Sequence, residues 1–210
     1  MNEAHDTLCS SPEWAEFLRN DVLPLVLEGT DLGRNMIEVG PGFGLATDVL
    51  QHQVEDLTAV EIDPVLAGLL AQRLVGTKVR VLHADGAHLP FDTGHFSSAA
   101  SFTMLHHVPS AAQQDALLTE LARVLRPGGV LVGSDSLDDP EFRKFHSGDV
   151  CVPVDPVDLP SRLRRSGFSD ITVGTSGEVL WFVARTASSS AARSSHLTPA
   201  ARLPTSRPTS

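Results

Sequence analysis

Three glycines at alternate positions are the first residues whose spacing suggests chemistry. Gly40, Gly42 and Gly44 follow an apolar run that ends at Val39, and a segment of helical pattern comes after them. Glycine lets a chain turn tightly and lets a ligand approach the backbone. A GxGxG pattern alone is weak evidence, but its place between strand and helix favours a nucleoside-binding turn. The alternative is a tight strand-to-helix connection that binds nothing.

Two acids end the next two apolar runs. Glu61 lies 17 residues after Gly44, about where an acid in open α/β sheets accepts hydrogen bonds from both ribose hydroxyls. Its alternative is an exposed acid near a helix start, a role that Asp63 fits better. Asp85 ends the third run, where a carboxylate can accept the exocyclic amine of adenine. Its alternative is an Asx turn into Gly86.

The composition of the turn separates two classes of cofactor. Dinucleotide-binding turns read G-x-G-x-x-G, and here the sixth position is Leu45. The turn holds no basic residue to meet a phosphate, and the acid Glu38 before it would repel one. These features argue against a nicotinamide-dependent oxidoreductase. A cofactor with a cationic sulfonium and an ammonium group suits the negative entrance.

The elements that would position these residues alternate between strand and helix. We expect strands at 35–39, 57–62, 78–83, 98–103 and 130–133. Ser11, Asp63 and Ser110 are expected to cap helices, and a hairpin split by Ser176 and Gly177 follows. The pattern predicts an α/β, Rossmann-like fold with a mostly parallel seven-stranded sheet, helices on both faces and an antiparallel C-terminal strand. Ligands bind such sheets at the carboxyl ends of the strands.

Prolines predict where two helices break or end. A first helix is expected from Ser11 toward Glu28, with a break or kink at Pro24. A later helix, begun at Ser110, is expected to end at Pro127-Gly128-Gly129, before the strand at 130–133. Residues 1–185 should form one domain, and the Ser-, Ala-, Pro- and Arg-rich segment 186–210 should be a disordered tail.

Charge and composition restrict the class of partner. The tail holds three of the 16 basic residues and no acid, so the rest has 26 acids against 16 − 3 = 13 bases, a charge near −13. A domain this acidic is a poor candidate for binding nucleic acid, which favours a small-molecule substrate. Cys9 and Cys151 have no metal-binding spacing and are expected to be thiols. With neither a membrane-length apolar run nor a signal sequence, we expect a cytoplasmic protein. The sequence predicts no oligomeric state.

Five segments together resemble a known family. IEVGPGFG, AVEID, HADGAHLPF, FSSAASFTMLHHV and LARVLRPGGVLVGSD look like the successive motifs of class I S-adenosylmethionine-dependent methyltransferases, most closely the methyltransferase type 11 subgroup. The resemblance covers about residues 34–135. It implies S-adenosylmethionine as cofactor and methyl transfer to a small-molecule oxygen or carbon acceptor. The alternatives are RNA or protein methylation, which the acidic charge disfavours, and a nucleoside-binding domain without catalysis.

The resemblance also assigns roles to residues. The expected cofactor contacts are Glu38, Gly40, Gly42, Gly44, Glu61, Ile62, Asp85, Gly86, Ser101 and Phe102. The glycines correspond to the family's contact with the methionine and ribose part, and the residues from Glu61 to Gly86 to its ribose and adenine contacts. Ser101 and Phe102 correspond to positions near the methyl donor. Gly86 departs from the usual Ala, and Ser97 stands where the family often has Asp.

Two adjacent histidines are the candidate catalytic groups. His106 and His107 follow the fourth strand, and an unperturbed imidazole titrates near pH 6.5, so either could accept a proton from the substrate. We expect His106 to face the acceptor and its neighbour to point toward the protein. The alternative is that both cap the next helix or pack under the loop.

By the same resemblance, residues 1–30 and the segment after the fifth strand should cover the substrate. His5, Trp14 and His146 lie in these segments. Trp14 is also placed to pack in the core. The chain has no HxH or HxxxH pair with a nearby carboxylate, so the spacing of its histidines predicts no metal site.

Overall fold

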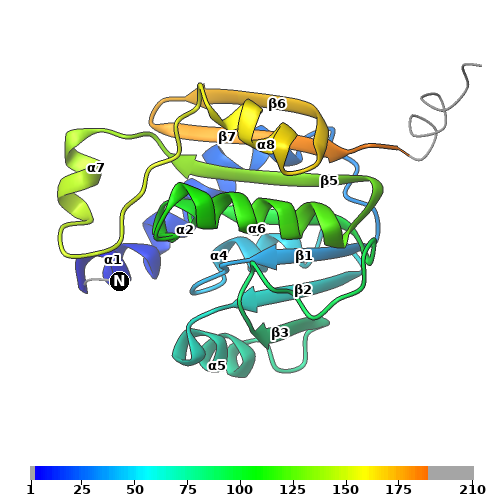
Figure 1. Ribbon diagram of the computed structural model, residues 1–210. Helices are drawn as coiled ribbons and strands as arrows, with labels where there is room; N and C mark the ends of the chain where they lie inside the picture. The colour runs from blue at the N-terminus through cyan, green and yellow to red at the C-terminus, as the bar shows by residue number, and fades with distance from the viewer. Residues whose placement is uncertain (1–2, 189–210) are drawn as a thin grey trace, which may run out of the picture.

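The computed structural model describes residues 3–188 and has the predicted α/β architecture (Figure 1). One seven-stranded sheet has the order β3-β2-β1-β4-β5-β7-β6. The strands are β1 (Asn35–Val39), β2 (Asp56–Glu61), β3 (Val79–His83), β4 (Phe96–Phe102), β5 (Leu125–Ser136), β6 (Phe168–Ser176) and β7 (Val179–Thr186). β7 is antiparallel to both its neighbours, and the other paired strands are parallel. The predicted fold class is therefore confirmed.

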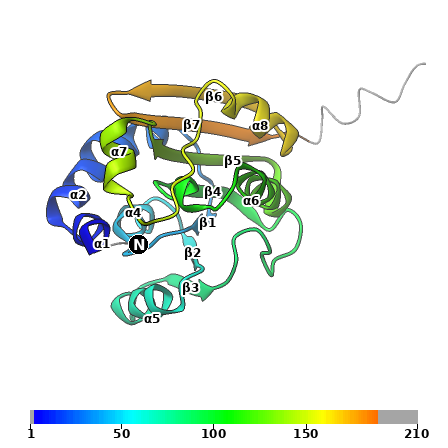
Figure 2. The same ribbon diagram turned by 60° about the vertical axis from the view of Figure 1, so that its left-hand side comes forward.

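Helices cover both faces of the sheet. The helical elements are α1 (Glu3–Cys9), α2 (Pro12–Phe17), η1 (Leu18–Val22), α3 (Leu23–Leu27), α4 (Leu45–Leu50), α5 (Pro64–Arg73), η2 (Leu105–His107), α6 (Ala111–Val124), α7 (Pro140–Phe145) and α8 (Leu159–Arg165). Buried side chains of α6 and α8 pack on one face. The segment from α2 to α4 packs on the other face, where α5 covers β2 and β3. α1 and α7 lie near each other beyond the carboxyl edge of the central strands (Figure 2).

Side-chain caps begin three helices, as predicted. Asp63 accepts hydrogen bonds from two backbone amides of the first turn of α5, and Pro64 is the first helical residue. Ser11 accepts one in α2, ahead of Pro12, and Ser110 accepts one in α6. These bonds satisfy amides that have no partner within the helix. These three helices thus start where the sequence places them.

The N-terminal segment differs from the single helix expected. A separate helix, α1, precedes Ser11, and a π-helical turn, η1, joins α2 to α3. In that turn the amide of Leu23 donates to the carbonyl of Leu18, and Pro24 occupies the first turn of α3. Proline lacks an N–H and its ring crowds the carbonyl four residues earlier. The wider turn just before Pro24 accommodates it without ending the helix.

The fifth strand is longer than predicted. It begins at Leu125, directly after α6, and runs through Pro127. Its pairing with β4 shifts between Leu125 and Val130, which makes Pro127-Gly128-Gly129 a bulge within the strand rather than a loop before it. A bulge tolerates proline because its missing N–H is not needed for the ladder. Helix α7 was not predicted.

The C-terminal boundary also moves by one residue. Thr186 is the last residue of β7, and its hydroxyl donates to the carbonyl of Arg126 at 2.8 Å. The rest of the predicted tail, from residue 189, lies outside the described residues. Within residues 3–188, every helix is too short or too polar to cross a bilayer.

Candidate functional site

The glycine turn lies at the carboxyl edge of β1, and its three glycines have different surroundings. Gly40, Gly42 and Gly44 have φ angles of 71°, 55° and 80°, a left-handed region that favours glycine. A Cβ on Gly40 would lie 2.8 Å from Cε of Met104, and one on Gly44 would meet Leu70. A Cβ on Gly42 would meet nothing within 4 Å. Two glycines are therefore required by packing, and Gly42 is the point where a ligand can approach.

Glu61 belongs to this turn and is not an exposed surface acid. Its side chain is buried, with the residue 5% exposed. Its Oε2 accepts the amide of Gly42 at 2.9 Å, and its Oε1 accepts the amide of Asp63 at 3.0 Å. Each oxygen keeps a second lone pair for another donor. Glu61 can thus hold the turn in place and still accept hydroxyl groups from a ligand.

Glu38 lies buried under the same turn. The hydroxyl of Thr47 donates to its Oε2 at 2.6 Å. Burial raises the pKa of Glu38 to about 7; the Thr47 hydrogen bond opposes that rise, and Asp48 and Glu61 add to it. Near neutral pH the carboxyl is therefore partly protonated, so its negative charge is weaker than the sequence suggests.

Arg73 is a residue of this region that the sequence does not reveal. It reaches the turn from α5, where its Nη2 donates to the carbonyls of Phe43 and Gly44 at 3.0 Å. Its Nη1 donates to both oxygens of Asp48 at 2.7 and 2.9 Å. The guanidinium thus braces the turn from behind, and its charge is already paired. No local spacing signals it, because it lies about thirty residues along the chain.

The expected adenine side is open. Ile62 is 64% exposed, which makes it an apolar platform beside Glu61. Asp85 accepts the amide of Ala87 at 2.9 Å, and its other oxygen lies 3.0 Å from Nδ1 of His88. The Ala87 amide and His88 lower the pKa of Asp85. The Asx turn considered as an alternative is therefore present, and it holds a charged, half-exposed carboxylate at this edge.

Two departures from the family pattern have local explanations. A Cβ on Gly86 would lie 2.5 Å from Cγ1 of Val39, so the usual Ala does not fit here. Ser97 is near the start of β4, at the opposite edge of the sheet. Its hydroxyl accepts the amide of Asn35 at 3.0 Å and donates to the carbonyl of Leu32 at 2.8 Å. Ser97 therefore fastens the entry to β1 and takes no part in the site.

The residues at the end of β4 lead into the loop that carries the two candidate catalytic histidines. Ser101 and Phe102 are buried in the sheet, so their contact with a methyl donor stays a prediction. Thr103 follows with a φ of 48°, in the left-handed region, and its amide donates to the carbonyl of Ser134 at 2.8 Å. This sharp turn brings Met104 against the glycine turn. The loop that carries both candidate catalytic histidines is thus packed on the cofactor side.

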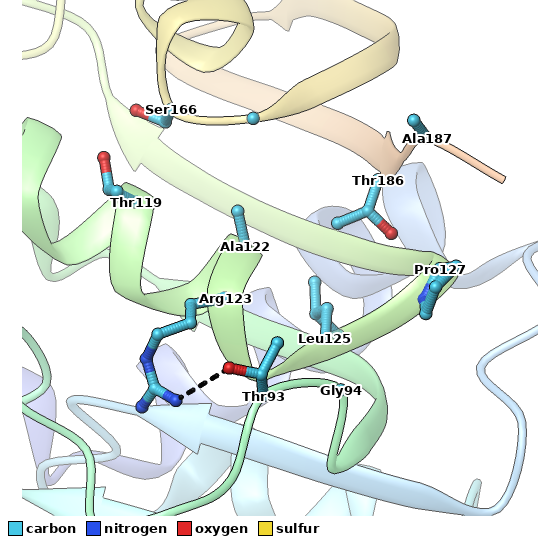
Figure 3. A pocket seen from close by; sticks show the side chains of 11 residues that line it. Thr93, Gly94, Thr119, Ala122, Arg123, Leu125, Pro127, Ser166, Thr186 and Ala187 are labelled. Atoms are coloured by element: carbon cyan, nitrogen blue, oxygen red, sulfur yellow. Dashed lines mark hydrogen bonds between the residues drawn. The ribbon is translucent and has the colours of Figure 1, made fainter. Parts of the chain in front are cut away.

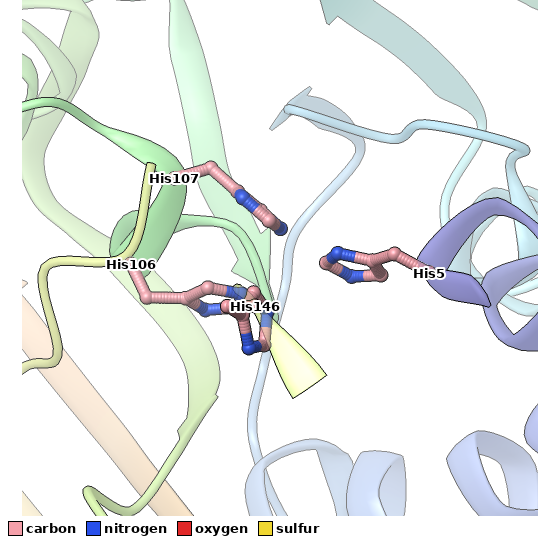
Figure 4. A group of neighbouring side chains, drawn as sticks. All are labelled: His5, His106, His107 and His146. Atoms are coloured by element: carbon pink, nitrogen blue, oxygen red, sulfur yellow. The ribbon is translucent and has the colours of Figure 1, made fainter. Parts of the chain in front are cut away.

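Four histidines from three segments meet beyond this loop (Figure 4). His106 and His107 lie on η2, His5 comes from α1, and His146 follows α7. One ring nitrogen from each lies within 4.8 Å of the others. We call these residues the four-histidine cluster. The rings of His106 and His107 have centroids 4.0 Å apart, and both belong to the cluster. The expectation that the two rings point in different directions is therefore wrong.

His106 is held by Asp135, an acid that sequence reasoning did not single out. Its Nδ1 lies 2.5 Å from Oδ1 of Asp135, and its backbone amide donates to the other oxygen at 3.1 Å. Both residues are buried, at 2% and 1% exposure. Asp135 fixes the ring so that Nε2 faces the cluster. That Nε2 has no hydrogen-bond partner among the described residues.

The other rings are held from outside as well. Nδ1 of His146 lies 2.7 Å from the carbonyl of Phe142, and His107 hydrogen-bonds the backbone of Val150. Burial, followed by the neighbouring imidazoles, lowers the pKa of His107 to about 3 and that of His5 to about 4. Burial also lowers the pKa of His146. These three rings are therefore neutral near pH 7.

A surface hollow elsewhere is not this site (Figure 3). It is lined by residues that precede β4, follow α6 and end β7, among them Gly94, Pro127 and Thr186. Arg123 and Thr93 form a hydrogen bond of 3.5 Å on its wall. The hollow lies at the amino edge of β4, whereas the glycine turn and both acids lie at the carboxyl edge. Ligands of open α/β sheets bind at the carboxyl edge.

The groups around the glycine turn fit the cofactor that the motifs imply. Gly42 leaves the backbone open to approach, the oxygens of Glu61 keep free lone pairs, and Ile62 offers an exposed apolar surface. A ribose and an adenine need these three features in this order along one edge of the sheet.

Comparison with known proteins agrees with this geometry. Residues 37–133 match a family model described as a methyltransferase domain. The chain is 33% identical over 112 residues to demethylluteothin O-methyltransferase of Streptomyces thioluteus, covering 51% of this chain and 49% of that protein. It is 38% identical over 110 residues to ribosomal RNA small subunit methyltransferase A of Kineococcus radiotolerans, covering 49% of this chain and 35% of that one. The chain thus spans half or less of the length of these curated relatives.

A solved structure extends the likeness to the whole fold. An S-adenosylmethionine-dependent methyltransferase of Thermotoga maritima superposes with a TM-score of 0.66 at 18% identity, covering 87% of this chain and 99% of that one. The matched family segment runs from β1 to β5 and contains the glycine turn, Glu61 and Asp85. Residues 37–133 therefore match the methyltransferase domain family, and the motifs within them are those of class I enzymes that use S-adenosylmethionine.

Proposed function

We propose that the protein transfers a methyl group from S-adenosylmethionine to an oxygen or carbon atom of a small molecule. The observation that carries this proposal is the cover over the catalytic loop. His5 of α1 and His146 after α7 both pack against the rings of His106 and His107, with centroid distances of 4.6–6.3 Å among His5, His106 and His146. A loop roofed by two segments suits an enclosed small acceptor better than a folded RNA.

The proposed cofactor contacts follow the carboxyl edge. Gly40, Gly42 and Gly44 would hold the methionine and ribose part, and Glu61 would accept the ribose hydroxyls. Ile62, Asp85 and Gly86 would hold the adenine, and Ser101 and Phe102 would lie near the methyl donor. Bound there, the cofactor would supply a methyl group carried on a sulfonium. The acceptor would bond to the methyl carbon, and the sulfur would leave with the electron pair of the broken bond.

The chain's own residues would position the methyl acceptor and remove its proton. In-line displacement depends on orientation, which contributes up to about 7–11 kcal/mol in ideal intramolecular cases. We assign His106 as the base in the metal-free protein, because Asp135 holds its Nδ1 and leaves Nε2 to accept the acceptor's proton. His107, whose ring lies beside it, would orient the acceptor. Asp135 acts through His106 and is a positioning residue.

The charge of the chain supports a small acceptor over RNA. The chain outside residues 186–210 carries 26 acids against 13 bases, counted as 16 − 3, and binding to nucleic acid depends on lysine and arginine. The ribosomal RNA methyltransferase match covers 49% of this chain and 35% of that protein. A cytoplasmic location, which the sequence predicts, belongs to the same proposal.

A methyl-transfer screen tests the function. The full chain is incubated with S-adenosylmethionine labelled on its methyl group and with fractionated metabolites, total RNA or total protein. We expect label in a small-molecule fraction, and Glu61→Ala should abolish it. Label confined to RNA or protein would overturn the small-molecule assignment. Cofactor binding by calorimetry without transfer to any fraction would favour the nucleoside-binding domain without catalysis.

A further inference from the structure

We propose that the four-histidine cluster binds one divalent transition-metal ion, and that Zn²⁺ fits its donors. Imidazole nitrogen is a good ligand for zinc. The cluster offers four such nitrogens within 4.8 Å of one another. Mg²⁺ and Ca²⁺ prefer oxygen ligands, so the donor set selects against them.

The spacing of the nitrogens is close to what a zinc ion needs. Zinc lies about 2.0–2.1 Å from imidazole nitrogen in a tetrahedral site, which puts its ligands roughly 3.4 Å apart. Nitrogens within 4.8 Å of one another reach that spacing when each ring moves inward by about 1 Å or less. Rotation of a side chain about its χ angles supplies such a movement without a change in the fold.

The outer hydrogen bonds of the rings are a second, independent observation. A ligating histidine usually donates its other ring N–H to a carboxylate or a backbone carbonyl, which fixes the ring for the metal. His106 has Asp135 in this place, His146 has the carbonyl of Phe142, and His107 has the backbone of Val150. The outer bonds of His106 and His146 are made by Nδ1 and leave Nε2 of each ring for the cluster.

Two of the inward nitrogens require a partner. Nε2 of His106 and Nε2 of His146 are buried, and neither has a hydrogen-bond partner among residues 3–188. The residues are 2% and 4% exposed. A buried polar atom without a partner costs about 1–3 kcal/mol, and proteins seldom keep two side by side. A shared metal ion satisfies both.

The charge at the cluster is matched as well. Four neutral imidazoles leave a dication uncompensated, and a buried charge needs a counter-charge. Asp135 is 1% exposed and bonded to His106. Oδ2 of Asp149 lies 3.8 Å from Nδ1 of His5. These two carboxylates, one behind each of two opposite rings, balance the two positive charges of the ion.

Such an ion would fasten the cover of the site. Its ligands come from α1, from η2 on the β4–α6 loop and from the residue after α7, so one ion would join both covering segments to the catalytic loop. It would also occupy the nitrogen that we assign as the base, because a ligating Nε2 has no lone pair left for a proton. If His106 is the base, zinc should therefore inhibit methyl transfer.

Zinc binding by the metal-free full chain tests the site directly. The chain is purified without a histidine tag, treated with chelator and titrated with Zn²⁺ by calorimetry, and bound zinc is counted by elemental analysis after dialysis. We expect one zinc per chain. Co²⁺ in place of zinc should give the visible absorption bands of a tetrahedral site.

Matched variants locate the ion. His5→Ala and His146→Ala should each weaken zinc binding at least about tenfold. Tenfold is the lower end of the loss seen when a hydrogen-bond partner of a ligand is removed, and these variants remove a ligand itself. His5 lies on the N-terminal helix, outside the sheet. His52→Ala, an exposed histidine elsewhere, should leave zinc binding unchanged. The site is wrong if no stoichiometric zinc binds, or if His5→Ala and His146→Ala bind it as tightly as the unaltered chain. These titrations use neither cofactor nor acceptor. Their outcome is therefore independent of whether the proposed methyl transfer is correct.

Discussion

Nδ1 of His106 lies 2.5 Å from Oδ1 of Asp135, and both side chains are buried at the carboxyl edge of β4 and β5. The bond places the ring proton on the side of Asp135 and leaves Nε2 as the basic nitrogen. In the metal-free protein, His106→Ala should lower turnover by about 10²–10⁴-fold. Rates are measured with chelator present and with the acceptor that the screen identifies.

Cofactor affinity is the control for this variant. S-Adenosylhomocysteine should bind His106→Ala as tightly as the unaltered chain, because the glycine turn and Glu61 are untouched. Asp135→Asn tests the positioning role, since an amide can stabilise the wrong tautomer of the ring; turnover should fall while cofactor affinity stays the same. A loss of turnover below about tenfold in His106→Ala would mean that methyl transfer proceeds by orientation alone.

The sequence predicts the fold well because its signals are local. Strand periodicity, the caps at Asp63 and Ser110, and the glycine turn each depend on residues a few positions apart, and the structure has them where expected. The irregularity expected at Pro24 takes the form of a π turn, whereas the path through Pro127 was mispredicted. Both prolines are accommodated by an irregular backbone, a π turn and a bulge, whose stability comes from packing rather than from the residue itself.

The site is predictable only in part, for a similar reason. Glu61 is placed by its distance from the turn, but His5 and His146 reach His106 only through the path of the covering segments. A search for HxH or HxxxH spacing misses a cluster whose ligands come from three elements. Asp135 did leave a signal, because it is an acid near the end of the fifth strand, as Glu61 ends the second.

Glu61→Ala should weaken the binding of S-adenosylhomocysteine at least about tenfold, which corresponds to 1.4 kcal/mol. The variant removes the carboxylate that we propose as acceptor of the ribose hydroxyls, and it also removes the hydrogen bond from the amide of Gly42, 2.9 Å long. Calorimetry at one temperature measures the change. Glu55→Ala, an exposed acid paired with Arg34, is the matched control and should bind normally. Equal affinity in the folded Glu61→Ala protein would place the ribose elsewhere.

Glu38 should make the stability of the cofactor-free protein depend on pH. Its folded pKa, raised to about 7 from 4.5 mainly by burial, means that the folded state binds more protons than the unfolded state between these values. Its contribution is fully present below about pH 4.5 and is lost as the pH rises through about 7. Glu38→Gln keeps an acceptor for Thr47 and removes the titration. Its free energy of unfolding, relative to the unaltered chain, should rise between pH 5 and pH 8 by up to about 3 kcal/mol.

The neighbours of Glu38 set the conditions of that test. Asp48 and Glu61 raise its pKa, and Arg73 lowers it, so these charges must be left intact in the comparison. Urea unfolding at several pH values gives the free energies. Glu28→Gln, at an exposed position, serves as the control for the loss of one acid. If the two variants show the same pH dependence, the carboxyl of Glu38 is charged in the folded protein.

Gly86 and Gly68 should respond in opposite directions to the same substitution. A Cβ on Gly86 would lie 2.5 Å from Cγ1 of Val39, whereas one on Gly68, in the exposed face of α5, would meet nothing within 4 Å. Gly86→Ala should therefore destabilise the fold by about 1–3 kcal/mol, the usual cost of overpacking a core. Gly68→Ala should stabilise it by about 0.5–1 kcal/mol, because alanine loses less backbone entropy in a helix. Thermal and urea unfolding measure both. Val39→Ala removes the crowding methyl groups, so Gly86→Ala should destabilise the Val39→Ala protein less than it destabilises the unaltered chain. If Gly86→Ala costs the same in both proteins, the contact with Val39 is not the cause.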